Sequence, residues 1–140
     1  MEQFLKMLSF DSTSGRERDF ALWLASELQA DSVRIDEVGD GSLNLLLSWG
    51  VPKVVFCTHI DTVPPYIAPS VCGKEVRGRG SCDAKGQIYS MYRACQSLAD
   101  MGRTGFALLL LSGEETGSFG AKAFAKTDFR APYLVVGEPT

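Results

Sequence analysis

The chain has 140 residues, of which 45% are hydrophobic and 22% charged, and its formal net charge is −3. Such a composition is typical of one soluble globular domain that is long enough to bury a substantial core. The acidic balance argues against a nucleic-acid partner, because a phosphate-binding face usually shows as a basic excess. We expect no membrane partner either, since no apolar run approaches the ~20 residues of a transmembrane helix and no signal-peptide pattern opens the chain.

The cysteines are few and widely spaced, and no two of them form a CxxC pair. Two disulfides would be possible, but a chain of this length with a good core does not need them. We therefore expect reduced thiols and a cytoplasmic location. The four residues are Cys57, Cys72, Cys82 and Cys95.

The first part of the chain is predicted to contain two helices and a hairpin. Apolar residues at positions 4–8 predict a short helix that ends near residues 11–12. Ser14 and Glu17 have the spacing of a capping box, which places Ser14 at the N-cap of a second helix. The two predicted hairpin strands cover residues 33–38 and 43–49, with Gly39-Asp40-Gly41 between them.

The second part alternates buried strands with helices. A helical period spans residues 85–101, a shorter helix is predicted at 119–126, and residues 75–79 could form an edge strand. Continuous apolar runs, typical of strands buried on both faces, cover residues 54–57, 106–111 and 133–136. The alternation predicts an α/β fold with a largely parallel central sheet flanked by helices.

Polar residues follow each of the three predicted buried strands, at the sheet edge where α/β proteins bind their ligands. His59, the only histidine, follows the first strand, Glu114 and Glu115 follow the second, and Glu138 follows the third. Asp61 comes two residues after His59, so in an extended segment both side chains point to the same side. The Asp61 carboxylate could then orient the imidazole of a metal-bound histidine.

Each of these residues also has an ordinary structural explanation. A lone histidine is more often a surface or core residue, adjacent acids often lie at a helix N-terminus, and Asp83 could simply cap the long helix that follows it. These explanations would all have to hold together. One imidazole and four carboxylates in one crevice instead indicate a divalent-metal site, for which zinc is suited and cobalt or manganese is possible.

Four segments of the chain, in order, resemble the motifs of one metallohydrolase family. That family includes acetylornithine deacetylase, succinyl-diaminopimelate desuccinylase, aminoacylase and glutamate carboxypeptidase. The resemblance covers the chain from about Ser9 to its end and implies a catalytic domain of the zinc-exopeptidase type. The matching segments are His59–Pro64, Gly78–Gly86, Glu114–Gly117 and Gly137–Thr140.

The resemblance implies two metal ions, each with its own ligands. His59 and Glu138 would bind one ion, Glu115 would bind the other, and Asp83 would bridge the two. The resemblance also implies a cis peptide bond between Asp83 and Ala84. Two zinc ions would occupy a complete site of this kind, with Co²⁺ or Mn²⁺ as possible replacements.

The resemblance assigns the chemistry to two further acids. Glu114 would be the general base, which takes a proton from the metal-bridging water and passes it to the leaving amine. Asp61 would contact the imidazole of His59 on the side that faces away from the metal. Adjacent side chains at a strand end diverge, so Glu114 and Glu115 are expected to have different roles.

The chain departs from the family pattern in two respects. The second metal of the family needs a further histidine far downstream, and this chain has none after His59. The family also carries a smaller dimerisation domain beyond the fourth motif. We therefore expect residues 1–140 to be the N-terminal portion of the metal-binding catalytic domain of a homodimeric parent, with the dimerisation domain and the C-terminal part absent.

The leading functional interpretation is a metal-dependent amidohydrolase that removes the acyl group from an N-acyl amino acid by attack of a metal-activated water. A dipeptidase or carboxypeptidase of the same family would use the same metal chemistry and is the alternative. A noncatalytic metal-binding domain is a third possibility, against which the presence of Glu114 argues. Either enzyme would act on a small molecule in amino-acid metabolism, and these residues alone are expected to have little activity.

Overall fold

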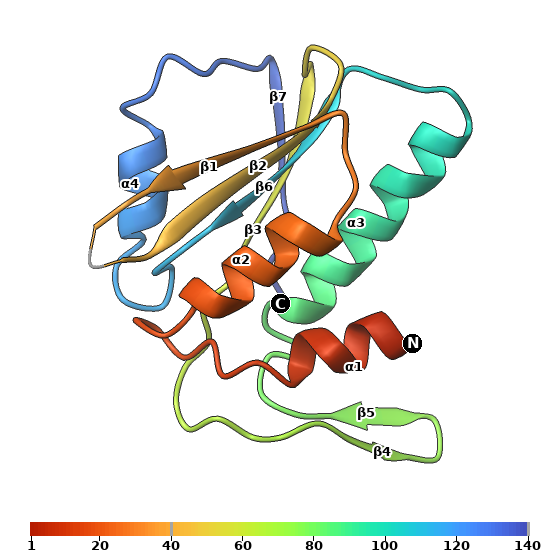
Figure 1. Cartoon of the computed structure of the whole chain (residues 1–140), viewed down its shortest axis with the longest axis vertical. Helices are drawn as coiled ribbons and strands as arrows, with labels where there is room; N and C mark the ends of the chain where they lie inside the picture. Colours follow the sequence, from red (N-terminus) through yellow and green to blue (C-terminus); the bar gives the residue numbers. More distant parts are fainter. Residues whose placement is uncertain (40, 140) are drawn as a thin grey trace.

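The computed structural model describes residues 1–39 and 41–139. Asp40, in the predicted Gly39-Asp40-Gly41 turn, and Thr140, the last residue of the fourth motif, lie outside the described residues. The described part of the chain forms a mixed sheet with helices on both faces and a small separate hairpin (Figure 1).

The central sheet has the strand order β1-β2-β6-β3-β7. β1 and β2 form an antiparallel hairpin, β2 pairs antiparallel with β6, and β3 lies parallel between β6 and β7. Four of the five strands therefore run in one direction and only β2 runs against them, which confirms the predicted largely parallel sheet. The strands are β1 (Ser32–Glu37), β2 (Leu43–Trp49), β3 (Val54–His59), β6 (Phe106–Leu111) and β7 (Tyr133–Val136).

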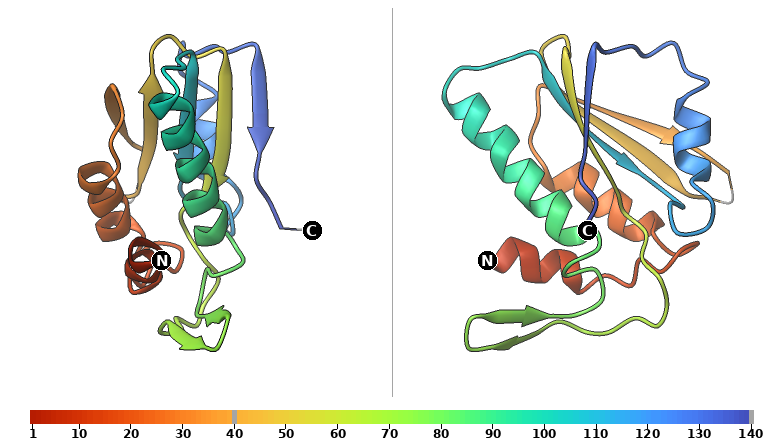
Figure 2. Two further views of the ribbon diagram at one scale, coloured as in Figure 1. Left: turned by 90° about the vertical axis from the view of Figure 1, so that its right-hand side faces the viewer. Right: turned by 180° about the vertical axis from the view of Figure 1, so that it is seen from behind.

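Helices cover the two faces of this sheet unequally (Figure 2). α1 (Glu2–Leu8), α2 (Arg18–Glu27) and α3 (Lys85–Asp100) pack over one face, and the short α4 (Phe119–Phe124) packs over the other. The remaining strands, β4 (Ser70–Cys72) and β5 (Glu75–Arg77), pair with each other in a hairpin that projects from the sheet. No helix in the described part of the chain is long and apolar enough to cross a membrane.

The larger core lies between the sheet and the three helices α1–α3. Leu108 and Leu110 of β6 are fully buried there against Phe20 of α2 and Tyr92 of α3. Val55, Cys57 and Leu109 point to the opposite face and form a smaller cluster with Phe124 and Phe129. β3 and β6 are therefore buried on both faces, as their continuous apolar runs predicted.

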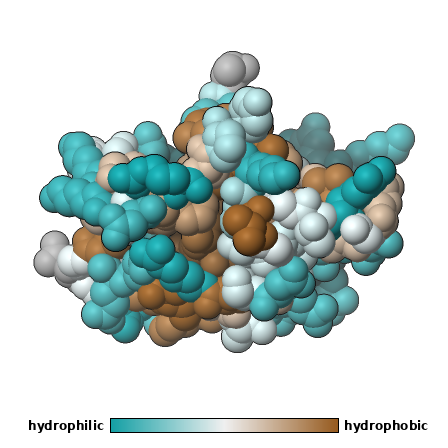
Figure 3. All heavy atoms as spheres, turned by 90° about the horizontal axis from the view of Figure 1, so that it is seen from above, coloured by the Kyte–Doolittle hydropathy of each residue, from teal (hydrophilic) through white to brown (hydrophobic). Residues whose placement is uncertain are grey.

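β7 is not buried, which contradicts the prediction for residues 133–136. Tyr133, Leu134, Val135 and Val136 are 67%, 60%, 45% and 57% exposed. β7 pairs with β3 only and lies at the end of the sheet, where the described helices leave most of its surface open. Apolar surface also lies open between hydrophilic side chains on the face that is uppermost in Figure 1 (Figure 3). An apolar run indicates a preference for burial but does not say whether a neighbouring element supplies it.

The predicted capping box is also wrong. α2 begins at Arg18, and residue 17 rather than residue 14 precedes it. Gly15 has a φ of +89°, which a right-handed helix cannot contain, so a helix with Ser14 as its N-cap is not possible. Ser14 and Glu17 have other partners instead: the Ser14 hydroxyl donates to Asp61, and the Glu17 carboxylate accepts the Gly15 N–H.

Replacement of Leu108 by alanine should lower the free energy of unfolding by about 2–5 kcal/mol, because it leaves a cavity in the larger core, next to the middle strand of the sheet. Leu134 on β7 is the matched control, and Leu134→Ala should change that free energy by no more than about 0.5 kcal/mol. Urea denaturation followed by circular dichroism measures both. Equal losses in the two variants would contradict the described difference in burial.

Candidate metal centre

The carboxyl ends of the parallel strands meet at one edge of the sheet, and this edge carries the predicted site residues. His59 is the last residue of β3, Glu115 lies in the loop after β6, and Glu138 follows β7 by two residues. Asp83 approaches the same edge from the turn that precedes α3. Parallel pairing therefore brings together residues that are up to 79 positions apart in the sequence.

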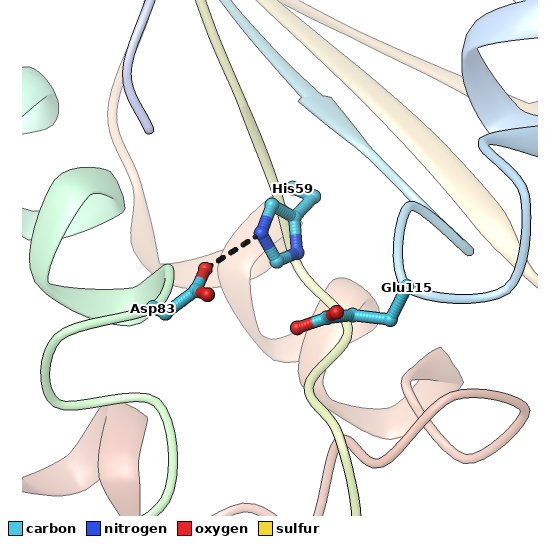
Figure 4. A group of neighbouring side chains, drawn as sticks. All are labelled: His59, Asp83 and Glu115. Carbon is cyan, nitrogen blue, oxygen red and sulfur yellow. Dashed lines mark hydrogen bonds and ion pairs between the residues drawn. The ribbon is translucent and has the colours of Figure 1, made fainter. Parts of the chain in front are cut away.

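The side chains of His59, Asp83 and Glu115 point toward one another (Figure 4). One ligand atom from each of the three lies within 4.8 Å of the others. His59 Nε2 lies 2.9 Å from Asp83 Oδ1 and 3.7 Å from Glu138 Oε2. The peptide bond between Asp83 and Ala84 is cis, as the motif resemblance predicted.

Asp83 does not act as a helix cap. α3 begins at Lys85, the residue before it is Ala84, and no side chain among the described residues caps its first turn. The Asp83 carboxylate faces His59 instead. The simpler explanation, in which Asp83 only caps the long helix, is therefore excluded.

Two hydrogen bonds with β3 hold the segment that carries Glu138. The N–H of Gly137 donates to the carbonyl of Cys57 at 2.8 Å, and the Thr58 hydroxyl donates to the carbonyl of Gly137 at 2.9 Å. These two bonds continue the pairing of β3 and β7 beyond the last strand residue. Glu138 is therefore directed along the same edge as His59.

The charges at this edge repel one another in the absence of a cation. Burial and the negative charge of Asp83 raise the pKa of Glu115. Burial and the negative charge of Glu114 raise the pKa of Glu138. Burial alone would lower the pKa of His59, but the hydrogen bond and charge of Asp61, with the nearby carboxylates, raise it to about 9. A divalent cation would relieve this repulsion, and imidazole with carboxylates is a donor set that suits zinc.

Asp61 is fully buried and accepts hydrogen bonds from three directions. Its Oδ1 accepts the N–H of Glu114 at 2.9 Å, and its Oδ2 accepts the N–H of Glu115 at 3.2 Å and the Ser14 hydroxyl at 2.8 Å. Burial alone would raise the pKa of Asp61, but hydrogen bonds from His59, Ser14 and Glu114 lower it. Asp61 thus stays an anion and holds the loop that carries both glutamates.

Asp61 also fixes the orientation of the imidazole. His59 Nδ1 lies 2.9 Å from the Asp61 backbone carbonyl and 3.4 Å from its Oδ1. An Nδ1–H that points at these acceptors leaves Nε2 to face Asp83 and Glu138. Spacing alone predicted that Asp61 could reach His59, but it did not reveal the backbone carbonyl as the nearer partner.

The two adjacent glutamates face different hollows. Glu114 lines a hollow of about 290 Å³ together with His59 and Glu138. Glu115 lines a second hollow, of about 540 Å³, together with Ser14 and Tyr66. The expected divergence of neighbouring side chains is therefore present, and it allows the two carboxylates to have different roles.

Asn44 is a residue that the sequence reasoning missed. It is buried on β2, where its Oδ1 accepts the N–H of Ser112 at 3.0 Å and its Nδ2 donates to the carbonyl of Gly120 at 2.8 Å. It thereby closes the loop of residues 112–120, which contains both glutamates. One signal was available: asparagine is disfavoured in strands and seldom buried, yet here it interrupts an apolar run.

Asn44→Ala should lower the free energy of unfolding by about 1–3 kcal/mol, because it leaves the buried Ser112 N–H and Gly120 carbonyl without partners. The exchange of the Ser112 amide proton should also accelerate. Ser48→Ala on the same strand is the control, since the Ser48 hydroxyl makes no hydrogen bond with the described residues. Equal stability of the Asn44→Ala variant and the wild type would contradict the closing role.

Comparisons with known proteins agree with this geometry. A curated relative, the LysW-lysine/LysW-ornithine hydrolase of Sulfurisphaera tokodaii, is 33% identical over 143 residues, which cover 99% of this chain and 39% of the relative. The crystal structure of aminopeptidase PepT from Bacillus cereus is 26% identical and superimposes with a TM-score of 0.79 over 96% of this chain and 41% of that one. The chain thus spans about two-fifths of the length of these relatives.

A more distant structure shares the fold. The M20 family metallo-carboxypeptidase of Sulfolobus solfataricus is 18% identical and has a TM-score of 0.84 over 96% of this chain and 36% of its own. The model of one protein family, described as Peptidase family M20/M25/M40, matches residues 55–140. This match contains all four motifs and well over half of the sequence, so the chain belongs to Peptidase family M20/M25/M40.

Proposed function

We propose that this chain is the metal-binding part of an amidohydrolase that cleaves a C–N bond in a small substrate. The observation that carries the proposal is the convergence of His59, Asp83 and Glu115 within 4.8 Å, with Glu138 at 3.7 Å from the imidazole. A buried imidazole with carboxylates from separate elements is costly without a cation and is suited to one.

The proposed ligand set divides between two ions. His59, Asp83 and Glu138 would hold the first, which is the usual number of protein ligands for a catalytic zinc. Asp83 and Glu115 would hold the second, together with an imidazole from outside these residues. Zinc is proposed as the metal, with Co²⁺ or Mn²⁺ as replacements. When bound, such ions supply Lewis acidity toward a carbonyl and lower the pKa of water.

The protein groups would then move the proton and keep the ligands aligned. Glu114, which lines the hollow beside His59, would accept a proton at its carboxylate and deliver it to the leaving amine. Asp61 would keep the Nδ1–H of His59 in place, so that Nε2 retains its lone pair for the metal. These roles rest on the motif resemblance together with the contacts described above.

Two substrate classes remain under this proposal. Removal of an acyl group from an N-acyl amino acid is the leading one, supported by the motif resemblance. Hydrolysis of a dipeptide or another peptide end is the alternative, supported by the likeness to an aminopeptidase at 26% identity. A panel of N-acyl amino acids and dipeptides, assayed with a polypeptide that carries the complete site, separates the two.

The same proposal includes the domain organisation and the cellular compartment of the complete protein. Residues 1–140 would be the N-terminal portion of the catalytic domain. The remaining histidine would come from farther downstream, and a dimerisation domain would supply the contacts of a homodimer. The four cysteines are free thiols, which supports a reducing compartment such as the cytoplasm.

Zinc titration of the chain tests the metal site directly. We expect one tight equivalent by calorimetry, because only the first site has three protein ligands here. Glu138→Gln should weaken this binding at least about tenfold, since even an indirect partner of a metal is worth about 10–100-fold. Glu114→Gln, the matched control, should bind zinc as the wild type does. Two tight equivalents, or none, would contradict the proposed division of ligands.

A second prediction separates the base from the ligand in a polypeptide with the complete site. Glu114→Ala should abolish turnover and leave the metal content near that of the wild type. Glu115→Ala should lower the metal content itself. If metal analysis gave equal losses for both variants, the two glutamates would not have different roles.

A further inference from the structure

Ser14 lies outside the proposed ligand set but is connected to it through Asp61. Its hydroxyl donates to Oδ2 of Asp61 at 2.8 Å. The same oxygen accepts the N–H of Glu115, and Oδ1 of the same carboxylate accepts the N–H of Glu114. Ser14 is therefore one contact away from the loop that carries the proposed base and the proposed ligand.

The backbone around Ser14 is fixed to the segment that follows β3. The Ser14 N–H donates to the carbonyl of Thr62 at 3.1 Å, and the Thr62 N–H donates to the carbonyl of Ser12 at 3.0 Å. Residues 12–14 thus run beside Thr62 as a short parallel bridge. Because Asp61 immediately precedes Thr62, this bridge holds the donor and the acceptor of the hydroxyl bond at a constant separation.

A buried acid holds the other side of Ser14. Glu17 is fully buried, its Oε2 accepts the N–H of Gly15 at 2.6 Å, and its Oε1 accepts the Ser42 hydroxyl at 3.0 Å. These bonds stabilise the turn in which Gly15 has a φ of +89°. The direction of the Ser14 side chain is therefore set from both sides.

We propose that Ser14 is a positioning residue for the metal centre. Its hydroxyl fixes the rotation of the Asp61 carboxylate, so that one oxygen stays opposite the Glu114 N–H and the other opposite the Glu115 N–H. Without this bond only the two loop N–H groups and the imidazole of His59 restrain the carboxylate, whose last side-chain torsion is broad and has no strong preference of its own. The bonds from the Glu114 and Glu115 N–H groups to Asp61 then weaken, and the alignment of Glu115 with His59 loosens with them. This inference rests on the proposed function only where it concerns metal affinity.

A purely structural role would give a different result. If the hydroxyl only satisfied a buried acceptor, its loss would lower the global free energy of unfolding. The loop amides would then become less protected by the same amount as the amides of the rest of the sheet. The positioning role requires the opposite: the Glu114 and Glu115 amides should open more often than the rest of the sheet. Amide exchange distinguishes the two because it reports each N–H separately.

The test compares Ser14→Val with Ser14→Thr in the 140-residue chain. Valine and threonine have the same shape, and only threonine keeps a hydroxyl; the hollow of about 540 Å³ beside Ser14 leaves room for the added methyl groups. Ser97→Val is the control, because among the described residues the Ser97 hydroxyl bonds only to the carbonyl of Arg93, on the solvent-exposed side of α3. If Ser14→Val does not fold, Ser14→Ala takes its place.

Two measurements are made on each variant: amide exchange by NMR in the metal-free protein, and Co²⁺ affinity by calorimetry. Ser14→Val should speed the exchange of the Glu114 and Glu115 amides about tenfold, relative to amides of β6, and weaken Co²⁺ binding about tenfold. Ser14→Thr and Ser97→Val should stay within about threefold of the wild type in both.

Unchanged exchange of these two amides in Ser14→Val, or equal changes in Ser14→Val and Ser14→Thr, would overturn the inference. A wild-type chain that binds no Co²⁺ would instead count against the proposed function. The exchange measurement would still decide the role of Ser14 in that case, because it uses the metal-free protein.

Discussion

The parallel pairing of β3 with β6 on one side and β7 on the other determines the rest of this structure. It places three strand ends at one edge, and each of these ends leads into a polar segment. Burial of β3 and β6 on both faces makes this pairing strongly favourable, because a shift of one residue would exchange the side chains of the two cores. The position of His59 is therefore set by the hydrophobic packing of the strands on which it depends.

Much of this arrangement could be read from the sequence. Uninterrupted apolar runs identified β3 and β6, because such runs are typical of strands that are covered on both faces. The same reasoning was wrong about the environment of β7, since the burial of an edge strand depends on elements that the run itself does not contain. The capping box was wrong for a related reason: the spacing of Ser14 and Glu17 is local, whereas the partners of both side chains lie on distant segments.

The candidate site shows the same division between local and non-local information. The sheet-edge rule and the motifs indicated which residues would gather, since strand order and chain direction bring them to one place. The contacts that hold them were not predictable in this way. Asn44 and Ser14 act on peptide groups or on a carboxylate far along the chain, and neither spacing nor composition encodes the partner of such a bond. The roles of the individual carboxylates stay predictions until metal binding is measured.

Asp61 grips the loop after β6 through peptide N–H groups rather than through side chains. Every amino acid except proline offers that N–H, so these hydrogen bonds do not depend on which residues occupy positions 114 and 115. The chemical groups at these positions could change during evolution while the path of the loop stayed the same. A loop held in this manner can acquire side chains for another reaction, or lose activity altogether, while its backbone conformation stays the same. Proline is the one residue that would break the contact at either position.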